Sequence, residues 1–124
     1  MKQNSDAVKL RTEDFALRVL RLYRSLPRTE EARILGKQLL RSSSSIGANY
    51  RAACRGRSRA EFVAKLGIVL EEVDETVFWL ELFQEGSIFP AGKLQGLVQE
   101  ANELVSIFVS SVRTAKGPPL QSNF

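Results

Sequence analysis

The sequence predicts an all-α protein folded as an antiparallel up-and-down four-helix bundle. Proline and glycine divide the chain into four segments, each with a packing face at helical spacing, and in the last two the face recurs at alternating steps of four and three. Period-two alternation, the signature of strands, does not persist beyond a few residues. Connections of roughly 2 to 6 residues force consecutive helices to run antiparallel. The predicted helices span about 12–26, 30–56, 58–85 and 90–116 in a single domain, with flexible ends at 1–11 and 117–124.

Capping and helix-breaking residues set the bounds of the first two predicted helices. Thr12 can cap the first helix, and Pro27 stops it because proline lacks the N–H that the next turn needs. Thr29 is a second N-cap residue and is followed by two glutamates that suit the positive end of a helix. Gly56 is placed to end this second helix. The resulting helix of about 26 residues has the length of a long bundle helix.

The third predicted helix has the clearest start in the sequence. Ser58 and Glu61 have the spacing of a capping box, in which each side chain bonds a free backbone N–H of the first turn. Gly86 and Pro90 mark the turn before the fourth helix. The apolar stripe of the third helix is Phe62, Leu66, Val69, Val73, Thr76, Leu80 and Phe83, and that of the fourth is Leu94, Val98, Ala101, Val105, Phe108 and Val112.

Composition argues against several classes of protein. The chain has no apolar run of the roughly 18 residues that would span a bilayer, and its charged first residues do not resemble a signal peptide, so we expect a cytoplasmic protein. It has no histidine, and Cys54 is its single cysteine. We therefore expect no enzyme activity, no cofactor and no metal site, although a carboxylate-only Mg²⁺ site stays open.

Charge is unevenly distributed along the chain. Residues 1–60 hold 14 Lys and Arg against 5 Asp and Glu, whereas residues 61–124 hold 4 against 9. Such segregation predicts either a polyanionic partner or pairing between subunits. Charge alone does not choose between them.

The basic residues of the second predicted helix form a stripe. At about 100° per residue, its five cations share an arc of about 80°, opposite the apolar arc. Between its two clusters lie Ser44 and Ala48, whose small side chains would let a phosphate backbone approach. We call this set the basic stripe and predict that it binds nucleic acid: Arg33, Lys37, Arg41, Arg51 and Arg55. A merely solvated face is the competing interpretation.

Polar residues also occupy the packing side of this helix. Ser42, Ser45 and Asn49 lie where a bundle normally places leucine, and Gly47 costs about 1 kcal/mol relative to alanine. Either the small residues allow a close approach of two helices or of two subunits, with polar groups bonding across the gap, or they line a polar pocket.

Aromatic residues on the third predicted helix indicate an interface. Phe78 and Trp79 fall outside the main apolar arc and lie among Glu71, Glu72 and Glu75. Exposed aromatics are typical of oligomer interfaces. These acids could receive the basic stripe of a neighbouring subunit, which would explain the charge segregation without nucleic acid. Trp79 could equally be a half-buried edge residue.

The residues from Gln38 to Thr76 carry a family resemblance. The patterns Q-L-x-R-S-x-x-S-I-x-A-N-Y-R-x-A and R-S-x-A-E-F-x-x-K-L-x-I-x-L-E-E-x-D-E-T, followed by Trp79-Leu80, resemble the 23S rRNA intervening sequence proteins. The architecture is also similar to that of the retroelement accessory variability protein. The resemblance implies an antiparallel bundle that assembles as a homopentamer. Ala52 departs from the glutamate usual in this segment and leaves the stripe more cationic.

Together these patterns favour a non-enzymatic, oligomeric bundle that binds RNA or DNA mainly through phosphates. The alternative is a structural module that assembles with other proteins and binds no nucleic acid. No pattern in the chain indicates a membrane partner or a small-molecule substrate.

Overall fold

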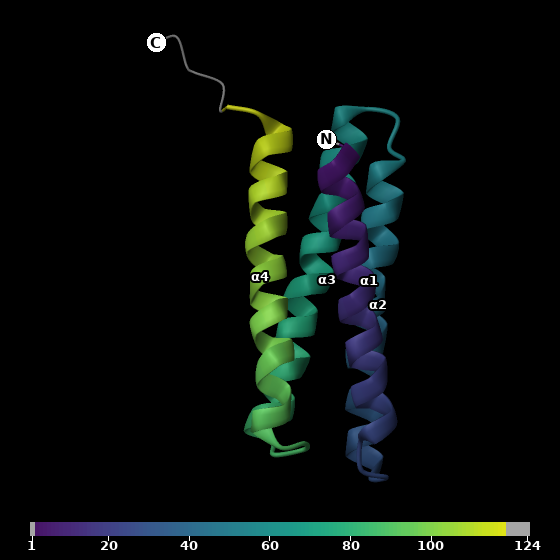
Figure 1. Ribbon diagram of the computed structural model, residues 1–124, viewed down its shortest axis with the longest axis vertical. Coiled ribbons are helices and arrows are strands. Elements are labelled where there is room, and N and C mark those ends of the chain that lie inside the picture. The colour runs from purple at the N-terminus through teal and green to yellow at the C-terminus, as the bar shows by residue number, and fades with distance from the viewer. Residues whose placement is uncertain (1, 119–124) are drawn as a thin grey trace.

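The computed structural model describes residues 2–118, and of residues 2 and 3 the backbone alone. Four helices follow one another in an antiparallel up-and-down bundle (Figure 1), and the described residues contain no strand. The predicted fold class is confirmed. The helices are α1 (Lys2–Ser25), α2 (Glu30–Cys54), α3 (Arg59–Glu85) and α4 (Ala91–Lys116).

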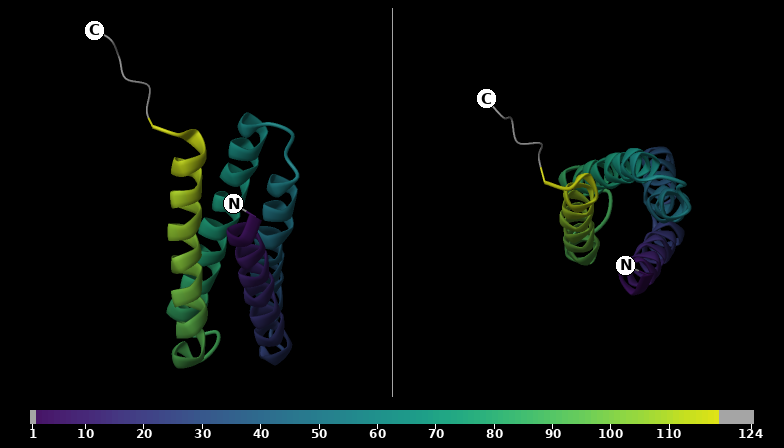
Figure 2. Two further views of the ribbon diagram at one scale, coloured as in Figure 1. Left: turned by 45° about the horizontal axis from the view of Figure 1, so that its top comes forward. Right: turned by 90° about the horizontal axis from the view of Figure 1, so that it is seen from above.

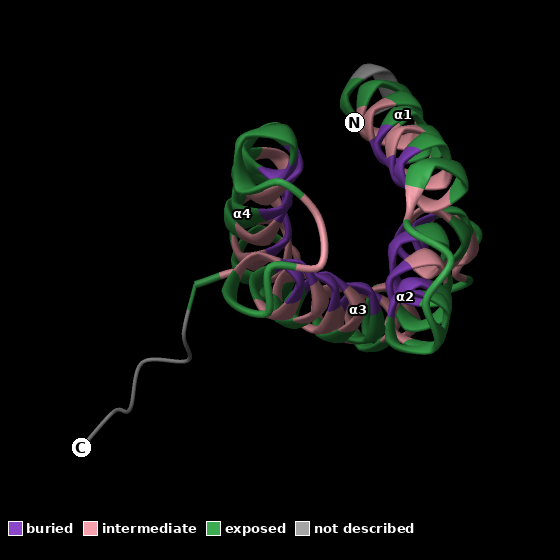
Figure 3. Cartoon of the chain, turned by 90° about the horizontal axis from the view of Figure 1, so that it is seen from below, coloured by how far each residue is buried: buried purple, intermediate pink, exposed green. Residues whose placement is uncertain are grey.

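Each helix packs on the next one along the chain. The pairs α1 with α2, α2 with α3 and α3 with α4 contact along their lengths, whereas α1 and α4 contact little. Seen along the bundle axis, the four helices follow a curve with α1 and α4 at its two ends (Figure 2). Buried residues lie on the inner side of this curve and exposed residues on the outer side (Figure 3).

The first helix begins ten residues earlier than the sequence analysis expected. Thr12 is not a cap: it lies inside α1, is buried, and its hydroxyl donates to the Lys9 carbonyl at 3.0 Å. The apolar stripe extends back through Thr12 to Val8, which packs on the core. A threonine inside a helix can bond its own backbone, so its type alone does not mark a helix start. The expected flexible end at 1–11 is therefore wrong for residues 2–11, and residues 119–124 lie outside the described residues.

The other predicted bounds agree with the structure within two residues. Thr29 Oγ1 accepts from the Ala32 N–H at 3.2 Å, and Ser58 Oγ accepts from the Glu61 N–H at 3.1 Å, so both predicted N-cap side chains cap their helices. The other half of the predicted capping box, a bond from the Ser58 N–H to the Glu61 side chain, does not form among the described residues. Six of the seven stripe residues predicted on α3 are fully buried. On α4 the buried face also includes Leu97 and Leu104, which the predicted stripe missed.

Close contact between α1 and α2 accounts for Gly47. A Cβ at this position would lie 3.1 Å from Thr12 Oγ1, which is tighter than most Cβ contacts in proteins, and in ordinary contact with Thr12 Cβ at 3.4 Å. The glycine lets α1 approach α2 at the point where Thr12 is buried. Tighter packing of α1 on α2 offsets the helix-propensity cost of this glycine.

Candidate nucleic-acid interface

All five residues of the basic stripe are exposed: four lie on α2 and the fifth, Arg55, is its C-cap residue. Ser44 and Ala48, between the two clusters, are exposed as well, as the helical spacing predicts. The other described residues of the chain therefore leave the basic stripe accessible to a binding partner. Its members differ, however, in whether a carboxylate already neutralises them.

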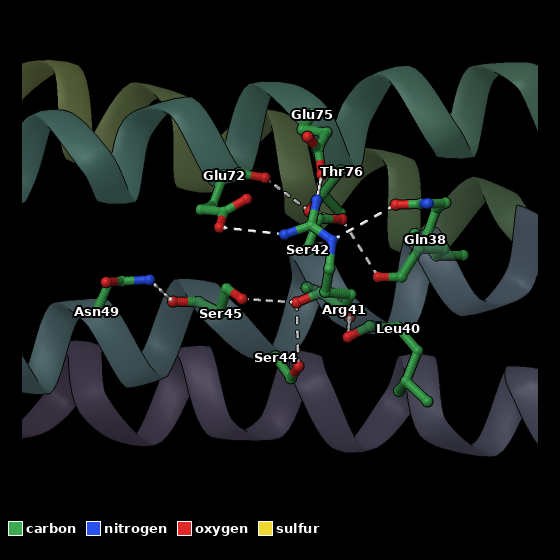
Figure 4. A network of polar contacts seen from close by, with 12 residues as sticks. Gln38, Leu40, Arg41, Ser42, Ser44, Ser45, Asn49, Glu72, Glu75 and Thr76 are labelled. Carbon is green, nitrogen blue, oxygen red and sulfur yellow. Dashed lines mark hydrogen bonds and ion pairs between the residues drawn. The ribbon is translucent and has the colours of Figure 1, made fainter.

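Arg41 is engaged with α3 of its own chain. Its guanidinium lies 3.5 Å from Glu72 Oε2 and forms a second ion pair with Glu75, while its Nε donates to Gln38 Oε1 at 3.4 Å (Figure 4). The Arg41 side chain keeps 48% of its surface exposed, so solvent screens these pairs. Glu72 and Glu75, which the sequence analysis considered as ion-pair partners for the basic stripe of a neighbouring subunit, thus already pair with Arg41 of their own chain.

Arg51 turns the other way, toward α1. Its Nη2 lies 3.5 Å from Glu13 Oε2, and both side chains are more than half exposed. An ion pair of this length and exposure contributes about 0 to 1 kcal/mol. Arg51 is therefore easily recruited by another anion.

Three cations of the stripe remain without a carboxylate. Among the described residues, Arg33, Lys37 and Arg55 form no ion pair and no side-chain hydrogen bond. The unpaired charge of α2 therefore lies toward the two ends of the helix, with Arg41 and Arg51 neutralised between them.

The polar residues on the packing side of α2 bond mainly to their own helix. Ser42 is buried and bonds across the gap to α3, with its Oγ 2.9 Å from Thr76 Oγ1. Ser45 instead donates to the Arg41 carbonyl at 2.8 Å, and Asn49 Nδ2 donates to the Ser45 carbonyl at 2.9 Å. Of the three predicted positions, Ser42 alone makes a hydrogen bond between helices in the part of the chain that the structure describes.

The two aromatics of α3 form an edge-to-face pair at the surface. Their ring centroids are 5.0 Å apart with an interplanar angle of 69°. Phe78 is 53% exposed, whereas Trp79 is half-buried against the core and its buried Nε1 has no hydrogen-bond partner among the described atoms. Exposed Ile68 lies on the same helix. The pair gives α3 an outward apolar surface beside the acids.

Comparison with known proteins identifies the family. Residues 5–110 match the 23S rRNA-intervening sequence protein family. This chain belongs to that family. A solved structure of a protein with unknown function from the S23 ribosomal protein family of Bacteroides thetaiotaomicron is similar, with 34% identity and a TM-score of 0.81. The match covers 87% of this chain and 96% of that one. A search of curated proteins found none that matches.

The sequence analysis missed a cationic pocket in this family member. The pocket has a volume of about 580 Å³ and lies where α1 turns into α2. Arg24 and Arg28 line it together with Arg33, which is the first residue of the basic stripe. Three arginines within ten residues around Pro27 were the available signal. A helical-wheel projection of one helix could not show this pocket, because its lining combines residues of two helices and a turn.

Other site chemistry gives no further candidate in the described part of the chain. No group of three or more His, Cys, Asp or Glu side chains is placed to hold a metal ion there. Cys54 is a free, partly buried cysteine. None of the described helices is both long and apolar enough to cross a membrane.

Proposed function

We propose that this chain is a non-enzymatic, cytoplasmic protein that binds RNA or DNA through phosphate contacts on the outer face of α2. One observation carries the proposal: the whole basic stripe is exposed, and Arg33, Lys37 and Arg55 have no carboxylate partner among the described residues. Like charges at i and i+4, as in Arg33 and Lys37, each cost a few tenths of a kcal/mol in a helix. A polyanion laid along the helix removes that repulsion.

The family description supports a nucleic-acid context. The description of the matched family refers to 23S rRNA, and the similar solved structure is assigned to a ribosomal protein family. Those words refer to the family and to that protein. They agree with the partner that the charge of α2 favours.

The contacts on α2 would be made to phosphates and would carry little sequence preference. An arginine guanidinium can bind two phosphate oxygens at once. The small, exposed side chains of Ser44 and Ala48 leave room for a nucleic-acid backbone between the two clusters of cations. Arg41 and Arg51 can join only by sharing or releasing their carboxylates. Their net contribution to affinity is therefore smaller than that of the unpaired cations.

Salt-dependent binding tests this proposal. In an anisotropy assay with labelled RNA and DNA oligonucleotides of unrelated sequence, Arg33→Gln with Lys37→Gln should weaken all complexes about equally. The slope of log K against log salt should fall by roughly 0.7 to 0.9 per lost contact. Arg113→Gln with Lys116→Gln removes the same charge from exposed positions on α4 and is the matched control. Equal losses in both double variants would refute a site on α2.

A second function, protein assembly without nucleic acid, is favoured by the exposed Phe78 and Ile68 on α3. We also propose, from the family resemblance, that the chain forms a homo-oligomer, and specifically a pentamer. Sedimentation should then give a mass several times that of the 13.9 kDa chain. Phe78→Ser should reduce that mass if α3 forms the interface. An assembled protein that binds none of the oligonucleotides would establish the second function in place of the first.

A further inference from the structure

The pocket between α1 and α2 combines the three features that a nucleotide needs. It has an aromatic wall in Tyr23, an apolar part in Leu26, and cations in Arg24, Arg28 and Arg33. Its volume of about 580 Å³ lies within the range of roughly 300 to 1,000 Å³ that small-molecule sites occupy.

A buried glycine holds the aromatic wall in place. A Cβ on Gly36 would lie 2.7 Å from Leu26 Cδ1 and 3.2 Å from Tyr23 Cδ1. The missing side chain of Gly36 therefore leaves the space on α2 into which one edge of the Tyr23 ring and the tip of Leu26 pack. The ring is half-buried, so part of it stays accessible in the pocket. A ring fixed by packing can stack a base at little cost in conformational entropy.

The charge of the pocket is uncompensated. Within residues 4–118, Arg24, Arg28 and Arg33 form no ion pair, in contrast to Arg41 and Arg51 on the same protein. Glu30 is the only acid in the lining. Three guanidinium groups against one carboxylate leave a net positive cavity that favours a phosphate.

We propose that this pocket binds one nucleotide unit, with its phosphate held by Arg24, Arg28 and Arg33 and its base against Tyr23. This inference rests on the proposed function, because Arg33 belongs to both the pocket and the basic stripe. A strand whose terminal nucleotide occupies the pocket can continue along α2 past Lys37. The same chemistry would accept a free nucleoside monophosphate.

Titration with AMP and with a 5′-phosphorylated single-stranded oligonucleotide tests the pocket and distinguishes its two sources of ligand. Wild-type protein should bind AMP more tightly than adenosine, and inorganic phosphate should compete. Arg24→Gln with Arg28→Gln should weaken AMP binding by roughly tenfold or more, since each charged hydrogen bond is worth at least that factor. Arg113→Gln with Lys116→Gln, which removes the same charge from exposed positions on α4, is the matched control and should leave AMP affinity unchanged.

A variant that is expected to strengthen AMP binding complements the two that weaken or preserve it. Glu30→Gln removes the only carboxylate of the lining and should strengthen AMP binding. Thermal melts of every variant check that the fold is kept, which the exposure of these side chains favours. AMP binding that is absent, or unaffected by Arg24→Gln with Arg28→Gln, overturns the pocket.

Binding of the oligonucleotide shows whether the pocket proposal alone fails or the proposed nucleic-acid function fails. If the oligonucleotide binds and responds to Arg33→Gln with Lys37→Gln but not to Arg24→Gln with Arg28→Gln, α2 binds nucleic acid and the pocket plays no part. If no oligonucleotide binds while AMP does, the pocket stands as a site for free nucleotides and the proposed function fails. Loss of both ligands in the Arg24, Arg28 variant supports a strand end in the pocket.

Discussion

Replacement of Gly47 by alanine should destabilise the protein although alanine is the better helix former. In a helix interior, glycine to alanine gains about 1 kcal/mol. At Gly47 the new methyl group would meet Thr12 Oγ1 at 3.1 Å and Thr12 Cβ at 3.4 Å. Thr12 is buried and its hydroxyl is held by the Lys9 carbonyl, so it cannot swing aside without losing that bond.

The chain provides a matched control for this substitution. Gly67 lies within α3, and a Cβ there would meet nothing within 4 Å. Gly67→Ala should therefore gain the propensity of about 0.5 to 1 kcal/mol with no steric cost. Overpacking a tight contact costs about 1 to 3 kcal/mol. The free energies of unfolding of the two variants should differ by about that amount, with Gly47→Ala the less stable.

Urea unfolding at one fixed protein concentration measures this difference, because stability would depend on concentration in an oligomer. Thr12→Ala removes the hydroxyl that the new methyl group would meet, so Gly47→Ala should cost less in a Thr12→Ala background. If Gly47→Ala stabilised the protein as much as Gly67→Ala, close packing of α1 on α2 at this point would be refuted.

Three further predictions concern polar groups. Ser42→Ala and Thr76→Val should each lower the free energy of unfolding by about 1 kcal/mol, and a double-mutant cycle should show coupling, because the two buried hydroxyls bond each other; additive losses would contradict this. Arg11→Met should cost about 1 kcal/mol, because Arg11 binds two carboxylates of α4, whereas Arg51→Met should cost about 0.5 kcal/mol or less, as melts at low and high salt would show. Burial, assisted by a neighbouring thiol, raises the pKa of Tyr50. Since that pKa is raised above the unfolded value of about 10, stability should be full below pH 10 and fall above it, and Tyr50→Phe should reduce this fall in alkaline unfolding curves.

The sequence determined which segments form helices and which faces they bury. Thr29 and Ser58 cap helices in the structure as their types and spacing predicted, because capping depends on residues three positions apart. The buried face of α3 follows from a period that is local to one helix. The start of α1 could not be read in this way, because Thr12 satisfies its hydroxyl within the helix and gives the same signal as a cap.

The tertiary structure decided which charges are free. A helical-wheel projection of α2 places Arg33, Arg41 and Arg51 on one arc. Arg41 nevertheless pairs with α3 and Arg51 with α1, whereas Arg33 has no ion pair among the described residues. An arginine of α2 is neutralised only where a neighbouring helix places a carboxylate at the same position along the bundle axis. That placement depends on how the helices pack on one another. For the same reason, the nucleotide pocket that we propose at the α1–α2 turn exists only once Tyr23 and Leu26 have packed against Gly36.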